Sequence, residues 1–265
     1  MYQLPIIEDH YDTPENPSGL RLHQINLLSQ ILFKIKFLNI SIHARRLCVK
    51  GNYPTAEWIR SSYDIMKLLE QSGGRFHISG IEHFRTIEGP VVFIGNHMST
   101  LETMVLPYLI SQHKDCTFVV KDALVKSKSF APIMKSRDPI VVSRHDSRAD
   151  LLLVLSRGPE ILSTGRSIVI FPQSTRRLVF DPEQFNSLGV KLASRANVPV
   201  IPFALKTDFW RNGKYIKDLG PLDKYNRDVY FSFGPAITVS KTGKDDNHHI
   251  IEFIQSRLAE WEHPR

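Results

Sequence analysis

The residues with the clearest chemical potential are a histidine and a carboxylate five positions apart, in the segment Asn96-His97-Met98-Ser99-Thr100-Leu101-Glu102. A carboxylate that holds one imidazole nitrogen fixes the tautomer of the ring and leaves the other nitrogen free to act as a general base. The same segment has a purely structural interpretation, because Ser99-x-x-Glu102 also matches a capping box, which stabilises a helix start by about 1 kcal/mol. It therefore predicts either an acid–base pair or a capped helix.

The elements around this segment decide how its side chains are placed. The apolar run at residues 91–95 predicts a buried strand, and the spacing of Leu101, Val105 and Leu109 predicts a helix directly afterwards. Residues five apart on one helix lie about 140° apart around its axis and do not face each other. We therefore expect His97 in the loop before the helix, with Ser99 as N-cap and Glu102 pointing back toward the loop.

Strands and helices alternate along most of the chain, which predicts an α/β fold with a mostly parallel mixed sheet covered by helices. The expected strands are residues 76–79, 91–95, 117–120, 139–143, 168–171, 200–205 and 229–233, with helices near 100–112, 147–163 and 187–196 and a last helix at the C-terminal end. We divide the chain into an N-terminal helical, membrane-associating region, residues 1–72, and an α/β domain, residues 73–265.

Composition excludes several classes of protein. A chain of 265 residues that is 42% hydrophobic and 23% charged is long enough and apolar enough for a globular core. Its two cysteines, Cys48 and Cys116, form no disulfide framework, and its histidines match no zinc signature, so we expect no metal. Residues 1–20 resemble neither a secretory signal nor a myristoylation site, which favours the cytoplasmic side of the cell.

Positive charge is concentrated in one segment. Residues 20–50 contain no acidic residue and six basic ones: Arg21, Lys34, Lys36, Arg45, Arg46 and Lys50. The remainder of the chain is nearly neutral, unlike a protein that binds nucleic acid over a broad surface, so we expect no nucleic-acid partner.

The same segment carries an apolar helical stripe formed by Leu28, Ile31, Ile35, Leu38 and Ile42. Two interpretations are open: a helix packed on the core with a solvated basic face, or a helix that lies in a membrane interface. The stripe is interrupted by lysines and does not predict a membrane-spanning helix, which needs about 18 consecutive apolar residues.

Three further segments place polar residues after a predicted strand, namely Asp138–Arg144, Phe171–Arg177 and Val198–Pro202. In an open parallel sheet the ligand crevice lies beyond the carboxyl ends of the strands. We therefore expect the histidine and the arginines of these segments to converge on one cleft.

Taken in order, the four segments resemble the blocks of the glycerolipid acyltransferase family, over about residues 76–207. Asn96–Glu102 is similar to that family's His-x4-Asp block, and Arg144 matches the arginine that closes its second block. Phe171–Arg176 is similar to its Phe-Pro-Glu-Gly-Thr-Arg block, and Val198–Pro202 to its Val-Pro-Ile-x-Pro block.

The resemblance implies transfer of a fatty acyl group from a CoA or acyl carrier protein thioester to a lipid hydroxyl, with 1-acylglycerol 3-phosphate as the expected acceptor and no cofactor. His97 would be the general base and Glu102 its orienting carboxylate. Backbone or side-chain donors at Ser99 and Thr100 are candidates for binding the oxyanion. The expected substrate-binding residues are Asn96, Ser99, Arg144, Thr175, Arg176 and Arg177, of which Arg177 has a second interpretation as a solvated loop charge.

The implied partners are a lysophospholipid, an acyl-CoA or acyl carrier protein, and a membrane surface. A lipid substrate favours the interfacial interpretation of the basic helix, which would attach the protein to the cytoplasmic face of a membrane as a peripheral or monotopic enzyme.

The sequence departs from the family pattern at three places. Glu102 replaces the usual Asp, Gln173-Ser174 replaces Glu-Gly, and Phe185–Gly189 lacks the lysine of the family's Phe-Lys-x-Gly pattern. Two alternatives therefore stay open: an acyltransferase with a different acceptor, and a non-enzymatic module that binds acidic membranes through residues 20–50.

Overall fold

One mixed sheet runs through the computed structural model, which describes residues 4–15, 27–127, 130–173, 175–214, 216–240 and 243–262. Within these residues eight strands follow the order β1-β2-β8-β7-β3-β6-β4-β5. They are β1 (Tyr11–Asp12), β2 (Arg75–Ser79), β3 (Val92–Gly95), β4 (Cys116–Lys121), β5 (Ile140–Val142), β6 (Ser167–Ile170), β7 (Val200–Lys206) and β8 (Asp228–Phe233). The pairs β1–β2 and β7–β8 are antiparallel and the others parallel, so the predicted fold class is confirmed.

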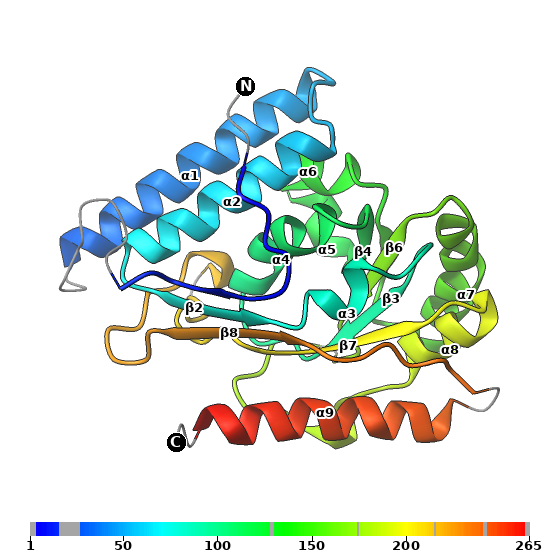
Figure 1. Cartoon of the computed structure of the whole chain (residues 1–265). Helices are drawn as coiled ribbons and strands as arrows, with labels where there is room; N and C mark the ends of the chain where they lie inside the picture. The colour runs from blue at the N-terminus through cyan, green and yellow to red at the C-terminus, as the bar shows by residue number, and fades with distance from the viewer. Residues whose placement is uncertain are drawn as a thin grey trace.

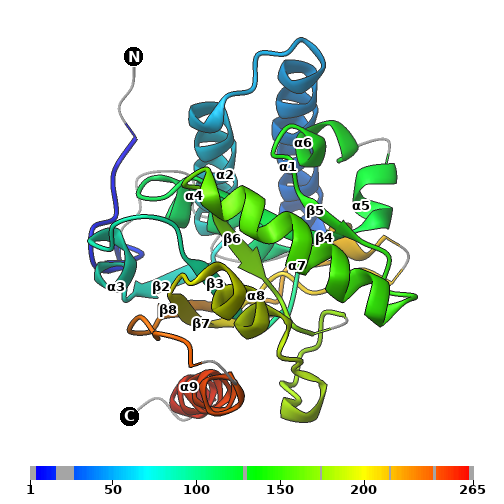
Figure 2. The ribbon, with the colours of Figure 1, turned by 90° about the vertical axis from the view of Figure 1, so that its right-hand side faces the viewer.

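Helices cover both faces of this sheet, with α1 and α2 on one side and α9 on the other (Figures 1 and 2). The helices are α1 (Leu27–Val49), α2 (Thr55–Gln71), α3 (Glu82–Arg85), α4 (Leu101–Ser111), α5 (Asp122–Lys126), α6 (Ala131–Lys135), α7 (Ser147–Ser163), α8 (Leu188–Ala196) and α9 (Lys244–Glu262). Successive side chains of a strand point to opposite faces. Phe93 accordingly joins the core under α1, α2 and α4, while Val92 and Ile94 join the core under α7, α8 and α9.

The end of β3 is fixed by a glycine. A Cβ atom at Gly95 would collide with the ring and the carbonyl oxygen of Phe203 on β7, so only glycine allows the two strands to approach this closely. The loop that carries His97 therefore leaves the sheet directly against β7.

The helix that carries Glu102 is tied to α2 at a proline. Pro107 lies inside α4 and has no N–H to donate. Ser62 of α2 fills the resulting gap, because its Oγ lies 2.5 Å from the carbonyl oxygen of Met104 and accepts a hydrogen bond from the backbone N–H of Tyr108 at 2.9 Å. Side-chain bonding at a proline satisfies backbone groups that the kink would otherwise leave unpaired.

Helix α1 presents its predicted apolar stripe outward. The five stripe residues are exposed, from 41% at Leu38 to 62% at Leu28, whereas Phe33 and Phe37 of the opposite face are buried against the core. The stripe is therefore not the face that packs on the domain. Arg21 of the basic segment lies outside the described residues. None of the helices in the described part of the chain has the length and apolar character needed to cross a bilayer.

Two parts of the sequence prediction need correction. Residues 1–72 are not purely helical, because Tyr11 and Asp12 form β1 on the edge of the sheet, paired with Ile78 and His77 of β2. The short helices α3, α5 and α6 were not predicted either, since helices of four or five residues are too short to show an apolar period.

Candidate active site

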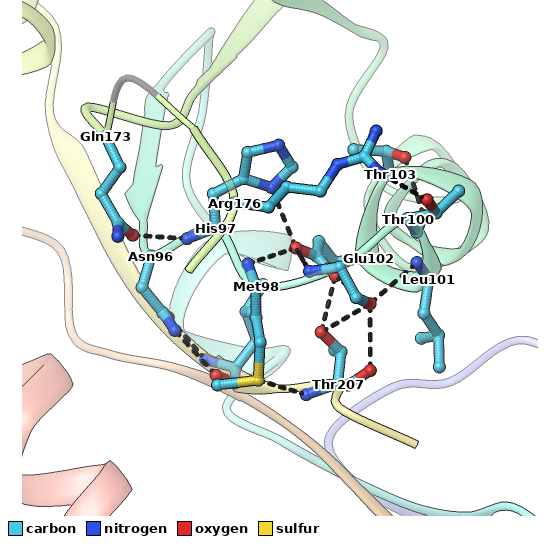
Figure 3. A network of polar contacts seen from close by, with 12 residues as sticks. Asn96, His97, Met98, Thr100, Leu101, Glu102, Thr103, Gln173, Arg176 and Thr207 are labelled. Carbon is cyan, nitrogen blue, oxygen red and sulfur yellow. Dashed lines mark hydrogen bonds and ion pairs between the residues drawn. The ribbon is translucent and has the colours of Figure 1, made fainter. Parts of the chain in front are cut away.

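The candidate site lies where β3, β6 and β7 end side by side. These strands are parallel to one another, so their carboxyl ends share one edge of the sheet. Residues 96–100 follow β3, residues 171–177 follow β6, and Thr207 follows β7. Figure 3 shows the side chains that this arrangement brings together.

His97 and Glu102 form a direct pair. Nδ1 of His97 lies 2.9 Å from Oε1 of Glu102, and the histidine stands in the loop before α4, as predicted. Because the carboxylate accepts, Nδ1 carries the ring proton and Nε2 is the basic nitrogen. The side chain of His97 is 11% exposed and that of Glu102 is fully buried, so only the histidine is accessible to a substrate.

Glu102 is the most heavily hydrogen-bonded carboxylate of the site. Besides His97, Oε1 accepts from the backbone N–H of Met98 at 2.6 Å and of Ser99 at 2.7 Å. Oε2 accepts from the hydroxyl of Ser99 at 2.9 Å. It also accepts from the hydroxyl of Thr207 at 2.6 Å (Figure 3). Burial alone would raise the pKa of Glu102, but the hydrogen bond and charge of His97, with the Thr207 hydroxyl, outweigh it and lower the pKa below its usual value.

Three contacts hold His97 in place, one through its ring and two through its backbone. The imidazole ring of His97 stacks on Phe171, with ring centroids 4.3 Å apart and planes inclined by 21°. Its backbone N–H donates to Oε1 of Gln173 at 2.7 Å, and its carbonyl oxygen accepts from the backbone N–H of Arg177 at 2.9 Å. Gln173 uses its carbonyl oxygen here, an atom that Gln and Glu share, so the departure from the family pattern preserves this contact. Ser174 lies outside the described residues.

Asn96 does not face a substrate. Its side-chain amide donates to the carbonyl oxygen of Leu205 at 2.8 Å and accepts from the backbone N–H of Leu205 at 2.9 Å. The residue is buried and fastens the loop after β3 to β7. The predicted substrate-binding role of Asn96 is therefore corrected to a structural one.

Ser99 also has a different role from the predicted one. Its backbone N–H and hydroxyl both bond Glu102, and its Oγ accepts from the N–H of Leu101 at 3.1 Å. The capping box and the catalytic pair thus coexist on one carboxylate, although α4 begins at Leu101, one residue later than Ser99 as N-cap implies. Because these donors are committed to the protein, Ser99 is not the expected oxyanion donor.

Arg176 lies next to the start of α4 and is held there by side chains. Its guanidinium donates to Oγ1 of Thr100 at 2.7 Å, to Oδ1 of Asn212 at 3.1 Å and to Oδ1 of Asp218 at 2.7 Å. Thr100 also donates to Asp218 at 2.9 Å, so its hydroxyl is not an oxyanion donor. The Arg176 side chain is 17% exposed and presents cationic surface beside His97.

Arg144 follows β5 in a left-handed backbone conformation, with φ of 60°. Such a conformation is unfavourable for a non-glycine residue. Asp150 supports it, because its carboxylate accepts from the N–H groups of Ser143 at 2.8 Å and Arg144 at 2.7 Å.

The pKa of Arg144 reflects its burial and two neighbouring charges. Burial lowers the pKa of Arg144, Asp150 partly offsets this effect, and the positive charge of Arg176 lowers the pKa further. An arginine stays protonated at neutral pH despite such shifts. The other two predicted binding residues, Thr175 and Arg177, are both exposed, and the backbone N–H of Arg177 bonds the carbonyl oxygen of His97.

Four residues of the site were not predicted as site residues: Thr207, Gln173, Asn212 and Asp218. Thr207 directly follows β7, so the rule that places ligand sites beyond the carboxyl ends of strands could have identified it. Asn212 lies in a loop and Asp218 in the short 3₁₀ helix Lys217–Leu219, and neither carries a comparable sequence signal.

Comparison with known proteins agrees with this geometry. The model of the acyltransferase family matches residues 75–206. A 1-acyl-sn-glycerol-3-phosphate acyltransferase of Pseudomonas aeruginosa is 27% identical over 204 residues, which cover 77% of this chain and 73% of that protein. A probable 1-acyl-sn-glycerol-3-phosphate acyltransferase of Mycoplasma genitalium is 26% identical over 176 residues, which cover 64% of this chain and 65% of that protein.

A solved structure has the same fold. The 1-acyl-sn-glycerophosphate acyltransferase of Thermotoga maritima superimposes with a TM-score of 0.66 at 13% sequence identity, covering 90% of this chain and 98% of that one. At this level of identity the likeness concerns the arrangement of strands and helices.

Proposed function

The chain belongs to the glycerolipid acyltransferase family, and we propose that it transfers a fatty acyl group from a CoA or acyl carrier protein thioester to the free hydroxyl of 1-acylglycerol 3-phosphate. The observation that carries this proposal is the His97–Glu102 pair, with its accessible histidine beside the partly exposed Arg176. The names of the relatives support the choice of acceptor.

In the proposed reaction His97 acts as general base. Nε2 removes the proton from the acceptor hydroxyl while the oxygen attacks the thioester carbonyl carbon. The ring then carries a positive charge, which Glu102 stabilises from a distance of 2.9 Å through the Nδ1 proton. The lowered pKa of Glu102 keeps this carboxylate ionised at neutral pH.

The second half of the reaction needs no further group on the protein. The tetrahedral intermediate collapses, the carbon–sulfur bond breaks, and the thiolate leaves with the proton that His97 holds. The product ester keeps the acyl group, and the histidine returns to its neutral form. A thioester is already an activated acyl group, so this scheme uses no metal or additional cofactor.

The arginines provide the acceptor site in this proposal. A guanidinium can hold a phosphate through two parallel hydrogen bonds and stays charged throughout. Arg176 and Arg144 would bind the phosphate of the acceptor, while the exposed Arg177 and Thr175 lie at the rim where a headgroup enters.

We further propose that the protein attaches peripherally to the cytoplasmic face of a membrane through α1. The five exposed apolar residues of its stripe are accompanied on the same helix by Lys36, Arg45 and Arg46, which are also exposed. An apolar face with neighbouring cations is typical of helices that lie in the interface of acidic membranes.

A panel of acceptors tests the proposed reaction. Thiol release from acyl-CoA and acyl carrier protein donors is measured with lysophosphatidate, glycerol 3-phosphate and monoacylglycerol as acceptors. We expect release with lysophosphatidate and at least tenfold less with monoacylglycerol, which lacks the phosphate. Equal rates with both would contradict a phosphate-binding role of the arginines. No release with any acceptor would favour the non-enzymatic membrane-binding module.

Vesicle binding tests the attachment. Sedimentation with vesicles that contain anionic lipid is expected to retain the wild-type protein. The double variant Ile31→Ser/Ile35→Ser should bind about tenfold more weakly or less, because it removes two exposed apolar side chains from the stripe. The matched pair Leu152→Ser/Leu153→Ser changes exposed residues of α7 and should bind like the wild type.

A further inference from the structure

The inner face of helix α1 contacts a loop whose residues bond Arg176 of the candidate active site. The loop comprises residues 209–223, of which residue 215 lies outside the described part, and it follows β7. Figure 2 shows it in gold at the N-terminal end of α1. Its two ends are joined by the bridge between Trp210 and Leu222 and by a hydrogen bond from the N–H of Asp223 to the carbonyl oxygen of Phe209 at 2.7 Å.

The joined ends of this loop rest on α1. The ring of Trp210 is buried edge-on between Phe33 and Phe37, at centroid distances of 5.0 and 4.9 Å. Gln30 donates to the carbonyl oxygen of Leu222 at 2.7 Å and accepts from its N–H at 2.9 Å. Aromatic packing and a two-way amide contact of this kind fix both the position and the orientation of the segment.

The middle of the loop bonds Arg176, the residue that we propose binds the acceptor phosphate. Asp218 accepts from both Arg176 and Thr100, and Asn212 accepts from Arg176 while donating to the carbonyl oxygen of Met98 at 3.2 Å. The loop therefore fixes the guanidinium of Arg176 relative to the segment that carries His97.

We propose that Gln30 and Trp210 are positioning residues for acceptor binding, and that α1 sets the place of Arg176 through the 209–223 loop. This inference rests on the proposed function, because it requires Arg176 to bind the acceptor phosphate. In this proposal the outer face of α1 contacts lipid, while its inner face supports the loop that positions Arg176 for the headgroup. Arg176 then stands at a constant depth relative to the lipid surface from which the acceptor comes.

The kinetic test separates acceptor binding from chemistry. The variant Gln30→Ala removes both contacts with Leu222, and we expect it to raise the KM for lysophosphatidate about fivefold. The KM for the acyl donor and kcat should stay within about twofold, because His97 and Glu102 do not contact the loop ends. Trp210→Ala should behave in the same way.

Two variants serve as controls. Trp210→Phe keeps an aromatic ring between Phe33 and Phe37. It removes no hydrogen bond, because the indole N–H of Trp210 has no partner among the residues that the structure describes. It should restore the acceptor KM to within about twofold of the wild type. Gln71→Ala changes an exposed glutamine at the end of α2 and should leave all constants unchanged.

A binding measurement decides the inference independently of turnover. Calorimetric titration with glycerol 3-phosphate should show weaker binding to Gln30→Ala and Trp210→Ala than to the wild type, each checked for folding by circular dichroism. If the wild type binds but transfers no acyl group, the proposed reaction fails and this comparison still decides the inference. An acceptor KM and an affinity that do not change in folded variants would overturn it, as would an absence of any binding by the wild type.

Discussion

Glu102 is fully buried and accepts hydrogen bonds from five donor groups, four of which belong to residues 97–99. Arg176, in contrast, is 17% exposed and is held by a loop that begins more than thirty residues later in the chain. The first arrangement is built by a tight turn between a strand and a helix. The second depends on how distant elements pack. The comparison indicates that the catalytic half is organised in advance of binding, while the binding half leaves part of an ion-paired arginine exposed to a ligand.

The sharpest way to break the catalytic half is Glu102→Gln, for which we expect the largest effect. The substitution keeps the size of the side chain but removes the charge that stabilises the imidazolium and fixes its tautomer. We expect kcat to fall by about 10² to 10⁴ with little change in the acceptor KM. Steady-state kinetics on the folded variant checks this, and a fall of less than tenfold would show that the carboxylate serves only the helix start.

A substitution in the binding half should change the acceptor KM rather than kcat. Arg176→Lys keeps the charge but loses the planar pair of donors, so we expect the acceptor KM to rise about tenfold or more while kcat changes less than threefold. Arg195→Lys, at an exposed position of α8, is the matched control and should change the KM by less than twofold. An equal loss of kcat in Arg176→Lys would remove the distinction between the two halves.

The stability of the protein in acid tests the catalytic half separately from activity. The pKa of Glu102 is lowered in the folded protein, so its ionised form stabilises the fold above the ordinary carboxyl pKa of about 4.3, and this contribution is lost as the pH falls through the lowered value. The difference in unfolding free energy between wild type and Glu102→Gln should therefore shrink below about pH 4. Urea unfolding of both proteins between pH 3 and 7 measures it. A constant difference would contradict the lowered pKa.

The smallest effect is expected at Thr207, which follows β7 and donates to Glu102 from outside the loop after β3. Thr207→Val removes the hydroxyl that donates to Oε2, while the Ser99 hydroxyl still donates to the same oxygen. We expect a loss of about 1 kcal/mol in unfolding free energy and a decrease in kcat of a few fold. Thr103→Val provides the comparison, because it removes a hydroxyl that donates to the carbonyl oxygen of Thr100 and does not contact Glu102 in the described part of the chain.

The same contrast explains which parts could be predicted from the sequence. His97 and Glu102 are five residues apart, and the apolar strand and helix on either side of them determine their relation locally. The strands β3, β6 and β7 were predicted within one or two residues, because their β-branched runs are bounded by glycine or proline.

The residues that were missed depend on tertiary packing. Asp218 meets Arg176 from the 209–223 loop, which lies more than thirty residues further along the chain and contacts α1, and no local period or spacing encodes that contact. Helix α1 shows the same limit. Its sequence is apolar on several faces, so the period predicted a stripe but not that Phe33 and Phe37, rather than the stripe, would pack on the core.

The most direct measurement compares wild type with His97→Ala for acyl transfer to lysophosphatidate, with vesicle binding and circular dichroism recorded on the same preparations. We predict that the variant remains folded, still binds vesicles, and loses at least 10³-fold of the acceptor-dependent thiol release. Release that continues at a rate within tenfold of the wild type would contradict the assignment of His97 as the general base.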